Sequence, residues 1–409
     1  MMNPYKTKKY LFLITGMVMG GAERVMATIA NEFAERGNEV LIVSLKDSSS
    51  TYRLDPRVKI VGAKGNIQSK YKFIRMLKLI FSGIKGFFYY LYYLKTYKPD
   101  VVLSFLTYSN LLAVITRLLF VRNIPVVISE RCDPLKRGYI IKKICEFIYP
   151  KADCLVCQSK RVGYYFRKSF RKTNIKTNIK TNIKTNRKTN IKTNIKIIPN
   201  PVNLECVAQT IPEKRRNTII AVGRLDSQKN YNLLIEGFQE IKSDYSDYIV
   251  EIYGQGPEYN NLYQKIQALH LENNIFLNGI KNNVMQSVHD AKLFVMTSDF
   301  EGFPNALVEA MASGLPVIST DFPTGIAKEL IKDGVNGYVV PRNDKKELAK
   351  AMVKILNNSE LQESMSMENR KITKQLDIDK IMDKWSTVLN EEYKRGFCHS
   401  NQYFKLKNR

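Results

Sequence analysis

Short apolar runs of strand length alternate with helical patterns along almost the whole chain. Strands that alternate with helices form parallel sheets with helices on both faces, so the pattern predicts an α/β fold. The pattern restarts near the middle, and we therefore expect two doubly wound domains in tandem, whose ligands bind beyond the carboxyl ends of strands. The expected strands are 10–15, 40–44, 101–104, 126–129 and 155–157 in the first half and 218–222, 249–253, 275–277, 293–296, 317–319 and 337–340 in the second.

Residues 70–98 are expected to form one long helix with an apolar stripe. Arg75, Lys78 and Lys85 lie off the stripe, and ten aromatic side chains crowd the segment. Two interpretations stay open: the helix packs on its own sheet with a solvated basic face, or its aromatic face contacts anionic lipid headgroups. The stripe consists of Phe73, Leu77, Ile80, Phe81, Ile84, Phe88 and Leu91.

A tetrapeptide repeat, K-T-N-I, occupies residues 172–196 between the two halves, with Arg187 in place of one Ile. It has regular positive charge and no acid, so it is either a solvated basic loop or a marginal strand or helix. Connections accept added length at low cost, and we therefore prefer a tolerated surface insertion, with a functional polybasic arm as the alternative.

The chain has 409 residues, more than one ordinary core holds, and 44% of them are apolar, as in ordinary globular proteins. Its excess positive charge is confined to the first half. Residues 1–150 contain 24 Lys and Arg against 10 Asp and Glu, residues 151–204 contain 14 against 1, and the remainder is almost neutral. The first half is therefore directed at an anionic partner, which is a nucleic acid, an anionic membrane surface or a phosphorylated lipid.

Several other classes of protein are not expected. Residues 10–22 imitate a secretory signal, but a helical pattern continues directly from them. No apolar run reaches the roughly 18–20 residues that a membrane-spanning helix needs. The six cysteines are scattered and suggest no disulfide framework. Cys154 and Cys157 form a lone C-x-x-C in an expected strand, where the two positions face opposite sides, so we expect no metal or redox role.

Two glutamates, Glu301 and Glu309, stand eight positions apart around a Gly-Phe-Pro-Asn turn that follows an expected strand. Pro304 suits the start of a helix, and the free amides of a helix start attract anions. A helix over 305–312 would carry Glu309 while Glu301 stays on the loop, so the two carboxylates would face one pocket. An isolated E-x7-E is more often a polar loop followed by a solvated glutamate, so the neighbouring motifs decide.

Turns at other strand ends of the second half add suitable groups. Arg224 and Lys229 follow the strand 218–222 and offer a fork and a point charge, enough to neutralise a leaving diphosphate without a metal. A Gly-Gln-Gly turn that begins at Gly254 lets the main chain approach a ligand. Residues 278–280, Asn-Gly-Ile, end another strand and would present main chain to a nucleobase.

The first half contains one comparable turn. Gly20 and Gly21 follow the first expected strand and open a helix, which suits a second phosphate-sized site. The spacing is not G-x-G-x-x-G, so a nicotinamide cofactor is not expected.

Together with the Pro-Asn-Pro-Val segment 199–202, these motifs resemble the family 4 retaining glycosyltransferases, which have the GT-B fold of two Rossmann-like domains facing a central cleft. Residues 104–107 and 129–134 resemble a subgroup that acts on polyprenyl-diphosphate-linked oligosaccharides, which includes N-acetylgalactosamine transferases and amylovoran-type exopolysaccharide glycosyltransferases. That subgroup usually has Asn where this chain has Cys132.

The resemblance implies a division of the chain and of its site. Residues 1–198 would bind the acceptor, 199–376 the nucleotide sugar, and the helical segment 377–409 would cross back to the first domain. Glu301, Arg224 and Lys229 would be catalytic, with the two cations on the donor diphosphate and Glu301 on the donor sugar. Glu309 would hold the ribose. The implied donor-binding residues are Gly223, Arg224, Lys229, Gly254, Gly279, Ile280, Glu301, Gly302, Phe303, Pro304, Asn305, Leu307 and Glu309, and the implied acceptor-binding residues are Gly20, Gly21, Glu130 and Arg131.

The expected activity is transfer of a hexose or N-acetylhexosamine from a UDP-sugar to a polyprenyl-diphosphate-linked glycan, in assembly of a bacterial capsule, O-antigen or similar glycan. We expect no cofactor, no metal and no nucleic acid, and a cytoplasmic protein held peripherally at the inner face of the cell membrane. The general base stays unassigned, because the three histidines, His270, His289 and His399, lie outside the first domain. A GT-B-fold sugar-nucleotide epimerase and a non-catalytic basic binder of membrane or nucleic acid are the alternatives.

Overall fold

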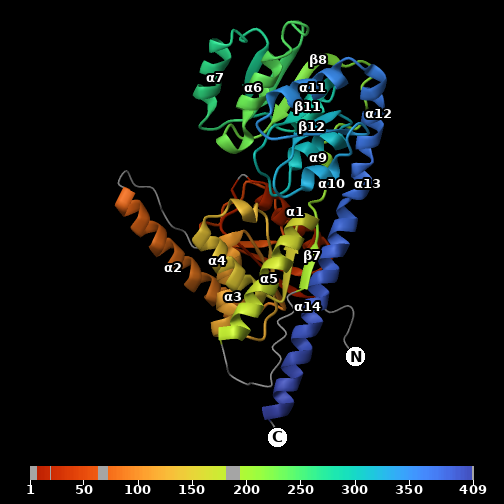
Figure 1. The fold of residues 1–409 in the computed structure, drawn as a ribbon. Helices are drawn as coiled ribbons and strands as arrows, with labels where there is room; N and C mark the ends of the chain where they lie inside the picture. Colours follow the sequence, from red (N-terminus) through yellow and green to blue (C-terminus); the bar gives the residue numbers. More distant parts are fainter. Residues whose placement is uncertain (1–6, 19, 63–71, 181–193, 408–409) are drawn as a thin grey trace. The chain divides into compact units, whose positions relative to one another are not determined.

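The computed structural model describes residues 7–18, 20–62, 72–180 and 194–407. The chain divides into two compact units. Unit 1 comprises Met1–Ile198 together with Ile381–Arg409, and unit 2 comprises Pro199–Lys380. Each unit contains one parallel sheet with helices on both faces, the doubly wound arrangement that the alternating pattern predicts (Figure 1).

The sheet of unit 1 has seven parallel strands in the order β3-β2-β1-β4-β5-β6-β7. The central strands are fully buried, as expected for apolar runs covered on both faces. The strands are β1 (Lys9–Ile14), β2 (Glu39–Ser44), β3 (Lys59–Gly62), β4 (Val101–Phe105), β5 (Val126–Ser129), β6 (Cys154–Cys157) and β7 (Asn194–Ile197).

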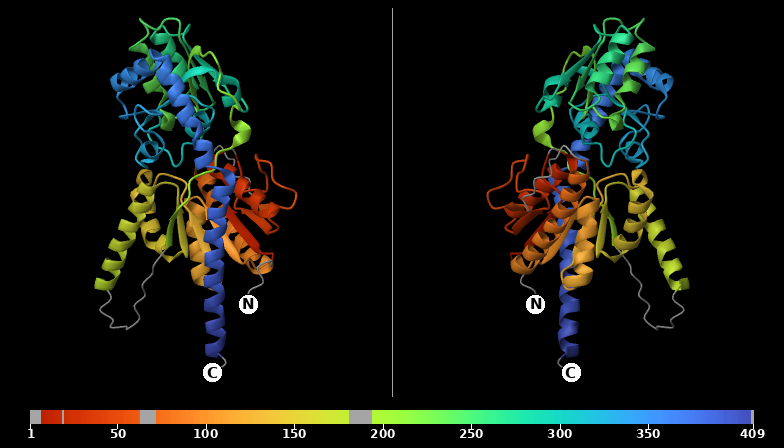
Figure 2. Two further views of the ribbon diagram at one scale, coloured as in Figure 1. Left: turned by 90° about the vertical axis from the view of Figure 1, so that its right-hand side faces the viewer. Right: turned by 90° about the vertical axis from the view of Figure 1, so that its left-hand side faces the viewer.

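Two layers of helices cover this sheet. On one face, Leu11 and Leu13 of β1 join a core with side chains of four helices, α2, α3, α4 and α5. On the other face, Phe33 of α1 packs against Tyr10 and Phe12, and α14 runs along the unit (Figure 2). The helices are α1 (Gly21–Glu35), α2 (Lys72–Tyr97), α3 (Thr107–Phe120), α4 (Tyr139–Ile148), α5 (Lys160–Lys180) and α14 (Ile378–Lys407), with short 3-10 turns η1 (Pro134–Lys136) and η2 (Tyr149–Lys151).

The sheet of unit 2 has six parallel strands in the order β10-β9-β8-β11-β12-β13. They are β8 (Arg216–Val222), β9 (Ile249–Tyr253), β10 (Ile275–Gly279), β11 (Ala291–Met296), β12 (Val317–Thr320) and β13 (Gly337–Val340). One core joins this sheet to α6 (Tyr231–Gln239), α7 (Tyr259–Ala268) and α11 (Lys345–Leu356), while α9 (Asn305–Ala312) packs on β11 and β12. The remaining elements are α8 (Val284–Val288), α10 (Ile326–Leu330), α12 (Ser359–Arg370), α13 (Ile372–Gln375), η3 (Leu204–Cys206) and η4 (Ser227–Lys229).

All eleven expected strands are present with small shifts at their ends, and two further strands, β3 and β7, were not predicted. The segment that imitates a secretory signal forms β1 and the start of α1. Within the described helices, none combines the length and the apolar character that crossing a membrane requires.

Of the two interpretations of the 70–98 helix, packing of the stripe on the sheet is wrong where the structure describes the side chains, whereas contact of this face with lipid headgroups stays a prediction. Ile84 and Phe88 are 49% and 62% exposed, whereas Tyr90 and Leu94 are buried and form part of the core. The helix is apolar on most of its circumference, so periodicity does not identify the face that meets the sheet. The side chains of the earlier stripe positions, Phe73, Leu77, Ile80 and Phe81, lie outside the described residues.

The K-T-N-I repeat is not simply a loop. Helix α5 continues through its first part to Lys180, and β7 begins inside its last part at Asn194. Ile195 of β7 is buried in the core of unit 1, and Arg167 donates a hydrogen bond to its carbonyl at 3.3 Å. Residues 181–193 lie outside the described part of the chain.

Candidate active site

The predicted donor residues meet where the strand order of unit 2 reverses. From the central pair β8 and β11, the chain continues outward to β9 on one side and to β12 on the other. Doubly wound sheets bind ligands at the carboxyl ends of strands at such a switch point. The loop 223–230 leaves β8 here, and the loop 297–304 leaves β11 next to it.

Glycines allow the loops after β8 and β9 to approach each other closely. A Cβ atom on Gly254 would lie 1.8 Å from the carbonyl oxygen of Gly223, and one on Gly223 would lie 2.9 Å from Cε of Lys229. Gly254 therefore makes room for the neighbouring loop, and its predicted approach to a ligand stays a prediction. Its amide donates to the carbonyl of Gly279 at 2.7 Å, where β10 ends with φ = +70°.

A short 3-10 turn, η4, positions Lys229. Asp226 precedes the turn and accepts a hydrogen bond from the Lys229 amide at 3.3 Å, and Asn230 ends it in the left-handed conformation. The other carboxylate oxygen of Asp226 lies 2.8 Å from the guanidinium of Arg224, whose side chain is 74% exposed. Sequence reasoning missed Asp226, although an Asp three residues before Lys229 is a recognisable capping signal.

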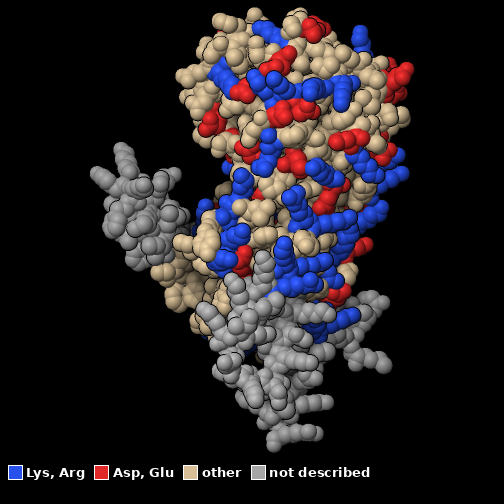
Figure 3. All heavy atoms as spheres, in the orientation of Figure 1, with Lys and Arg blue, Asp and Glu red and all other residues tan. Residues whose placement is uncertain are grey.

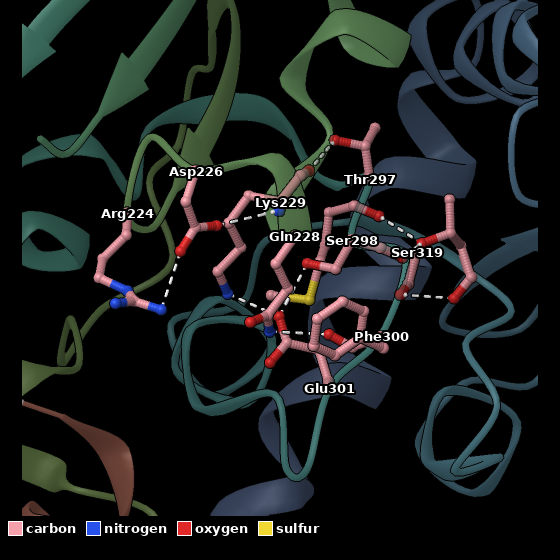
Figure 4. A network of polar contacts seen from close by, with 11 residues as sticks. Arg224, Asp226, Gln228, Lys229, Thr297, Ser298, Phe300, Glu301 and Ser319 are labelled. Atoms are coloured by element: carbon pink, nitrogen blue, oxygen red, sulfur yellow. Dashed lines mark hydrogen bonds and ion pairs between the residues drawn. The ribbon is translucent and has the colours of Figure 1, made fainter. Parts of the chain in front are cut away.

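Lys229, Glu301 and Ser298 form one polar cluster (Figure 4). Oε1 of Glu301 lies 2.6 Å from Nζ of Lys229 and accepts a hydrogen bond from Oγ of Ser298 at 2.7 Å. The Lys229 and Glu301 side chains are 17% and 9% exposed, and Ser298 is fully buried. The structure thus brings together the predicted cation and carboxylate and adds a serine that was not predicted as a site residue.

Three further hydrogen bonds, each accepted by a main-chain carbonyl, also join the two loops. Oγ1 of Thr297 donates to the Lys229 carbonyl at 2.9 Å, the Asp299 amide donates to the Gln228 carbonyl at 2.8 Å, and the Gln228 side chain donates to the Phe300 carbonyl at 2.8 Å. These bonds fix the spacing between Lys229 and Glu301 before any ligand arrives, as an electrostatic site requires.

Helix α9 spans the residues expected, with Pro304 as its N-cap. Phe303 and Pro304 are buried and Gly302 is half-buried, while the side chain of Asn305 accepts a hydrogen bond from Asn200 at 2.8 Å. Glu309 is half-buried on this helix and Ile280 is 53% exposed. Leu307 is fully buried, so its side chain supports α9 in the core.

The glycine turn of unit 1, Gly20 and Gly21, is hydrogen-bonded to a side chain of its own unit. Gly20 caps α1, its amide donates to the hydroxyl of Tyr52 at 2.9 Å, and that hydroxyl lies 2.7 Å from the Gly20 carbonyl. A Cβ on Gly20 would lie 2.3 Å from a carboxylate oxygen of Glu23. The binding of an acceptor phosphate by Gly20 and Gly21 stays a prediction.

Glu130 and Arg131 are buried at the end of β5 and stabilise their own loop. Glu130 pairs with the buried side chain of Arg137, and its other oxygen accepts hydrogen bonds from the amides of Arg131 and Cys132, both at 3.1 Å. Burial lowers the pKa of Arg137, but the charge and hydrogen bond of Glu130 together with the neighbouring Tyr149 and Cys145 raise it by more, so that pKa lies above its usual range. Arg137 also donates to Thr107 Oγ1 at 2.8 Å, which ties this loop to the start of α3.

Arg131 stacks on aromatic rings instead of lying at an exposed surface. Its guanidinium lies 3.9 Å from the ring centre of Phe105 and 5.6 Å from that of Trp385, the only tryptophan of the chain. Burial lowers its pKa to about 9, against the opposing charge of Glu130. Arg137 and Trp385 were missed because no local pattern links them to residues 130 and 131.

The end of β4 is strained. Leu106 has φ = +73° and ψ = 149°, a conformation that costs a non-glycine residue about 1–3 kcal/mol. β1 and β4 are the switch-point strands of unit 1, and such strain gathers at functional sites. This end of unit 1 is therefore a candidate ligand-binding edge.

The fold is that of the GT-B glycosyltransferases. Sucrose-phosphate synthase from Thermosynechococcus elongatus matches with a TM-score of 0.77 and 16% identity, over 95% of this chain and 100% of that chain. The Anabaena protein HepE, in complex with UDP, matches with a TM-score of 0.71 and 17% identity, over 94% of this chain and 100% of that chain.

Two family models match the chain, one in each unit. Glycosyltransferase Family 4 matches residues 19–177, in unit 1, and Glycosyl transferases group 1 matches residues 206–372, in unit 2. The chain belongs to the family 4 glycosyltransferases, and it is an enzyme.

Full-length relatives support this assignment. A Campylobacter jejuni enzyme named as an α-1,4-N-acetyl-D-galactosaminyltransferase that acts on a diphospho-undecaprenol-linked glycan is 26% identical over 390 residues, which cover 94% of this chain and 98% of the relative. The amylovoran biosynthesis glycosyltransferase AmsD of Erwinia amylovora is 24% identical over 384 residues, 93% of this chain and 99% of the relative. The comparisons favour neither the epimerase nor the non-catalytic binder.

Proposed function

We propose that this glycosyltransferase moves a hexose or N-acetylhexosamine, with retention at the anomeric carbon, from a UDP-sugar to a polyprenyl-diphosphate-linked oligosaccharide during bacterial polysaccharide or glycan assembly. The observation that carries the proposal is the cluster of Lys229, Glu301 and Ser298 at the switch point of unit 2. The pairing of HepE with UDP and the substrate in the name of the Campylobacter relative support the donor and the acceptor.

The donor diphosphate would take over the cation that Glu301 now holds. Lys229 supplies a point charge from a fixed position, and the more exposed Arg224 supplies a mobile fork. Both stabilise negative charge on the leaving diphosphate, which is the charge that develops in the transition state. Glu301 then becomes available to accept hydrogen bonds from sugar hydroxyls, with Ser298 still fixing its orientation, and Glu309 would hold the ribose.

The proposed reaction uses no separate general base and no metal. The departing phosphate would accept the acceptor proton on the same face of the sugar, which accounts for retention. The two cations would supply the charge that a divalent ion supplies in other transferases. We therefore expect transfer to proceed with chelator present.

The acceptor proposal assigns the basic unit to the lipid-linked glycan. Unit 1 contains 44 Lys and Arg against 14 Asp and Glu, a net charge of +30, whereas unit 2 has a net charge of −4. Such a field favours a diphosphate on an anionic membrane over a neutral soluble sugar. We place the enzyme at the cytoplasmic face of the membrane, as a peripheral protein.

The test is sugar transfer by the purified protein to lipid-linked acceptors in membrane extract, with a panel of radiolabelled UDP-, GDP- and ADP-sugars. We expect transfer from a UDP-sugar alone and loss of at least about 100-fold in Lys229→Ala or Glu301→Ala. Lys345→Ala is a control, because Lys345 also pairs with a carboxylate of unit 2, that of Glu240 at the C-terminal end of α6, at 2.7 Å. Full activity in Lys229→Ala would refute the site, and transfer from a GDP-sugar would refute the donor.

A further inference from the structure

Helix α4 exposes large apolar side chains along most of its length. Tyr139 and Ile140 are 75% and 72% exposed, and three further residues of this ten-residue helix also project from the surface. Only Cys145 is buried. The exposed apolar residues of α4 and of the turn before it, called here the α4 face, are Leu135, Tyr139, Ile140, Ile141, Ile144 and Phe147.

Burying large apolar side chains is normally favourable, so six that face water need an explanation. Soluble proteins expose single apolar residues freely, but five large ones on a ten-residue helix, with a sixth in the turn before it, indicate an interaction surface. The α4 face is stably held on its other side, because Cys145 and Tyr149 belong to the core of unit 1.

Lysines lie beside two aromatic rings of the α4 face. The ammonium of Lys143 lies 5.7 Å from the ring centre of Tyr139, and that of Lys151 lies 3.4 Å from the ring centre of Phe147. Lys136 and Lys142 stand in the same segment. Its one acid, Glu146, lies 2.9 Å from Lys143. Aromatic rings with lysines beside them are typical of residues at a membrane interface, where the ring lies among acyl chains and the ammonium among headgroups.

The positive charge of unit 1 also suits an anionic membrane, and it extends beyond α4. On the face of unit 1 that Figure 3 shows, Lys and Arg predominate over Asp and Glu among the coloured residues, in agreement with the net charge of +30 of this unit. An anionic lipid surface complements both the apolar side chains and this charge. A nucleic acid complements the charge but provides no apolar phase in which isoleucine side chains can be buried.

We propose that the α4 face is the surface by which unit 1 inserts into an anionic membrane. The place of α4 in the chain connects this membrane contact to the predicted acceptor loop. Arg137, whose ion pair with Glu130 holds the predicted acceptor loop, stands two residues before α4 begins. Insertion of α4 therefore holds that loop at the depth of the lipid headgroups, where the diphosphate of a polyprenyl-linked acceptor lies. This last step rests on the proposed function, but the insertion does not.

The experiment is co-sedimentation of the full chain with vesicles of phosphatidylcholine, with and without phosphatidylglycerol. We expect the double variant Ile140→Ser, Ile144→Ser to bind anionic vesicles at least about tenfold more weakly than the unaltered chain. Tyr259→Ser, Tyr263→Ser is the matched control, because these residues of α7 in unit 2 are 44% and 47% exposed, and it should bind normally. The unaltered chain should also bind pure phosphatidylcholine at least about tenfold more weakly.

Equal binding by the α4 variant, equal loss in the α7 control, or tighter binding to RNA than to anionic vesicles would overturn the proposal. Thermal melting checks that the variants are folded. Transfer to a water-soluble, short-chain acceptor should be unchanged in the α4 variant, and transfer to an acceptor in vesicles should fall with binding. If no sugar is transferred under any condition, the proposed function fails, while the vesicle result still decides the fate of the α4 face.

Discussion

Replacing Ser298 by Ala tests whether the orientation of Glu301, and not only its presence, supports transfer. The substitution removes the hydroxyl that donates to Glu301 Oε1 at 2.7 Å, in a position with no exposure to solvent. A hydrogen bond to a charged group contributes about 1.5–3 kcal/mol, and part of this is retained because Lys229 still holds the carboxylate. We therefore expect a loss of about 1–2 kcal/mol, which corresponds to a decrease of roughly 5- to 30-fold in kcat/KM for the donor.

The assay compares two quantities for the same variant. Affinity for UDP, measured by calorimetry, should stay within about twofold, because UDP lacks the transferred sugar that Glu301 would contact. The value of kcat/KM for the UDP-sugar should fall as stated. Ser319→Ala is the control, because Ser319 is also a fully buried serine and donates only to the neighbouring carbonyl of Thr320, at 3.2 Å. Equal losses of UDP affinity and transfer, or no loss in Ser298→Ala, would refute the reasoning.

Four further outcomes are expected. Lys229→Ala should weaken UDP binding more than Arg224→Ala, measured by calorimetry, because the Arg224 side chain is 74% exposed and mostly solvated. Arg137→Leu should lower the free energy of unfolding by about 3–5 kcal/mol in a denaturant titration, because Glu130 stays buried without its partner. Transfer should continue in EDTA, and its loss, restored by Mg²⁺, would contradict the metal-free reaction. Replacing residues 181–193 by a neutral Gly/Ser linker of equal length should preserve transfer to a soluble acceptor, and a loss would favour a functional arm.

The central strands could be predicted from the sequence, because the strands of a parallel sheet that is covered on both faces are continuous apolar runs. The two strands that were missed lie at the edges of the unit 1 sheet. β3 is only partly buried, and β7 lies in a repeat whose composition is typical of a loop. Edge strands need fewer apolar residues, so composition alone conceals them. Helix α2 has the opposite property. It is apolar on most of its circumference, so the sequence does not show which of its faces is buried.

The candidate site divides in a similar way. Lys229 and Glu301 were predicted together because carboxyl ends of adjacent parallel strands meet at one edge, and the structure joins them. The surroundings of Glu130 and Arg131 were not predictable. The ion pair of Glu130 depends on a 3-10 turn that brings Arg137 back to it. The ring contact of Arg131 depends on Trp385, which is 254 positions further along the chain. Contacts of that separation leave no local pattern.

Helix α14 makes unit 1 discontinuous, and this has a consequence for synthesis. Asp383 pairs with Arg36, Trp385 contacts Phe105, and Glu391 pairs with Lys196, so the last helix completes the hydrophobic layer on one face of the first sheet. Unit 2 is contiguous and leaves the ribosome before α14 does. Unit 1 begins first along the chain but can thus be completed only after unit 2 has been synthesised.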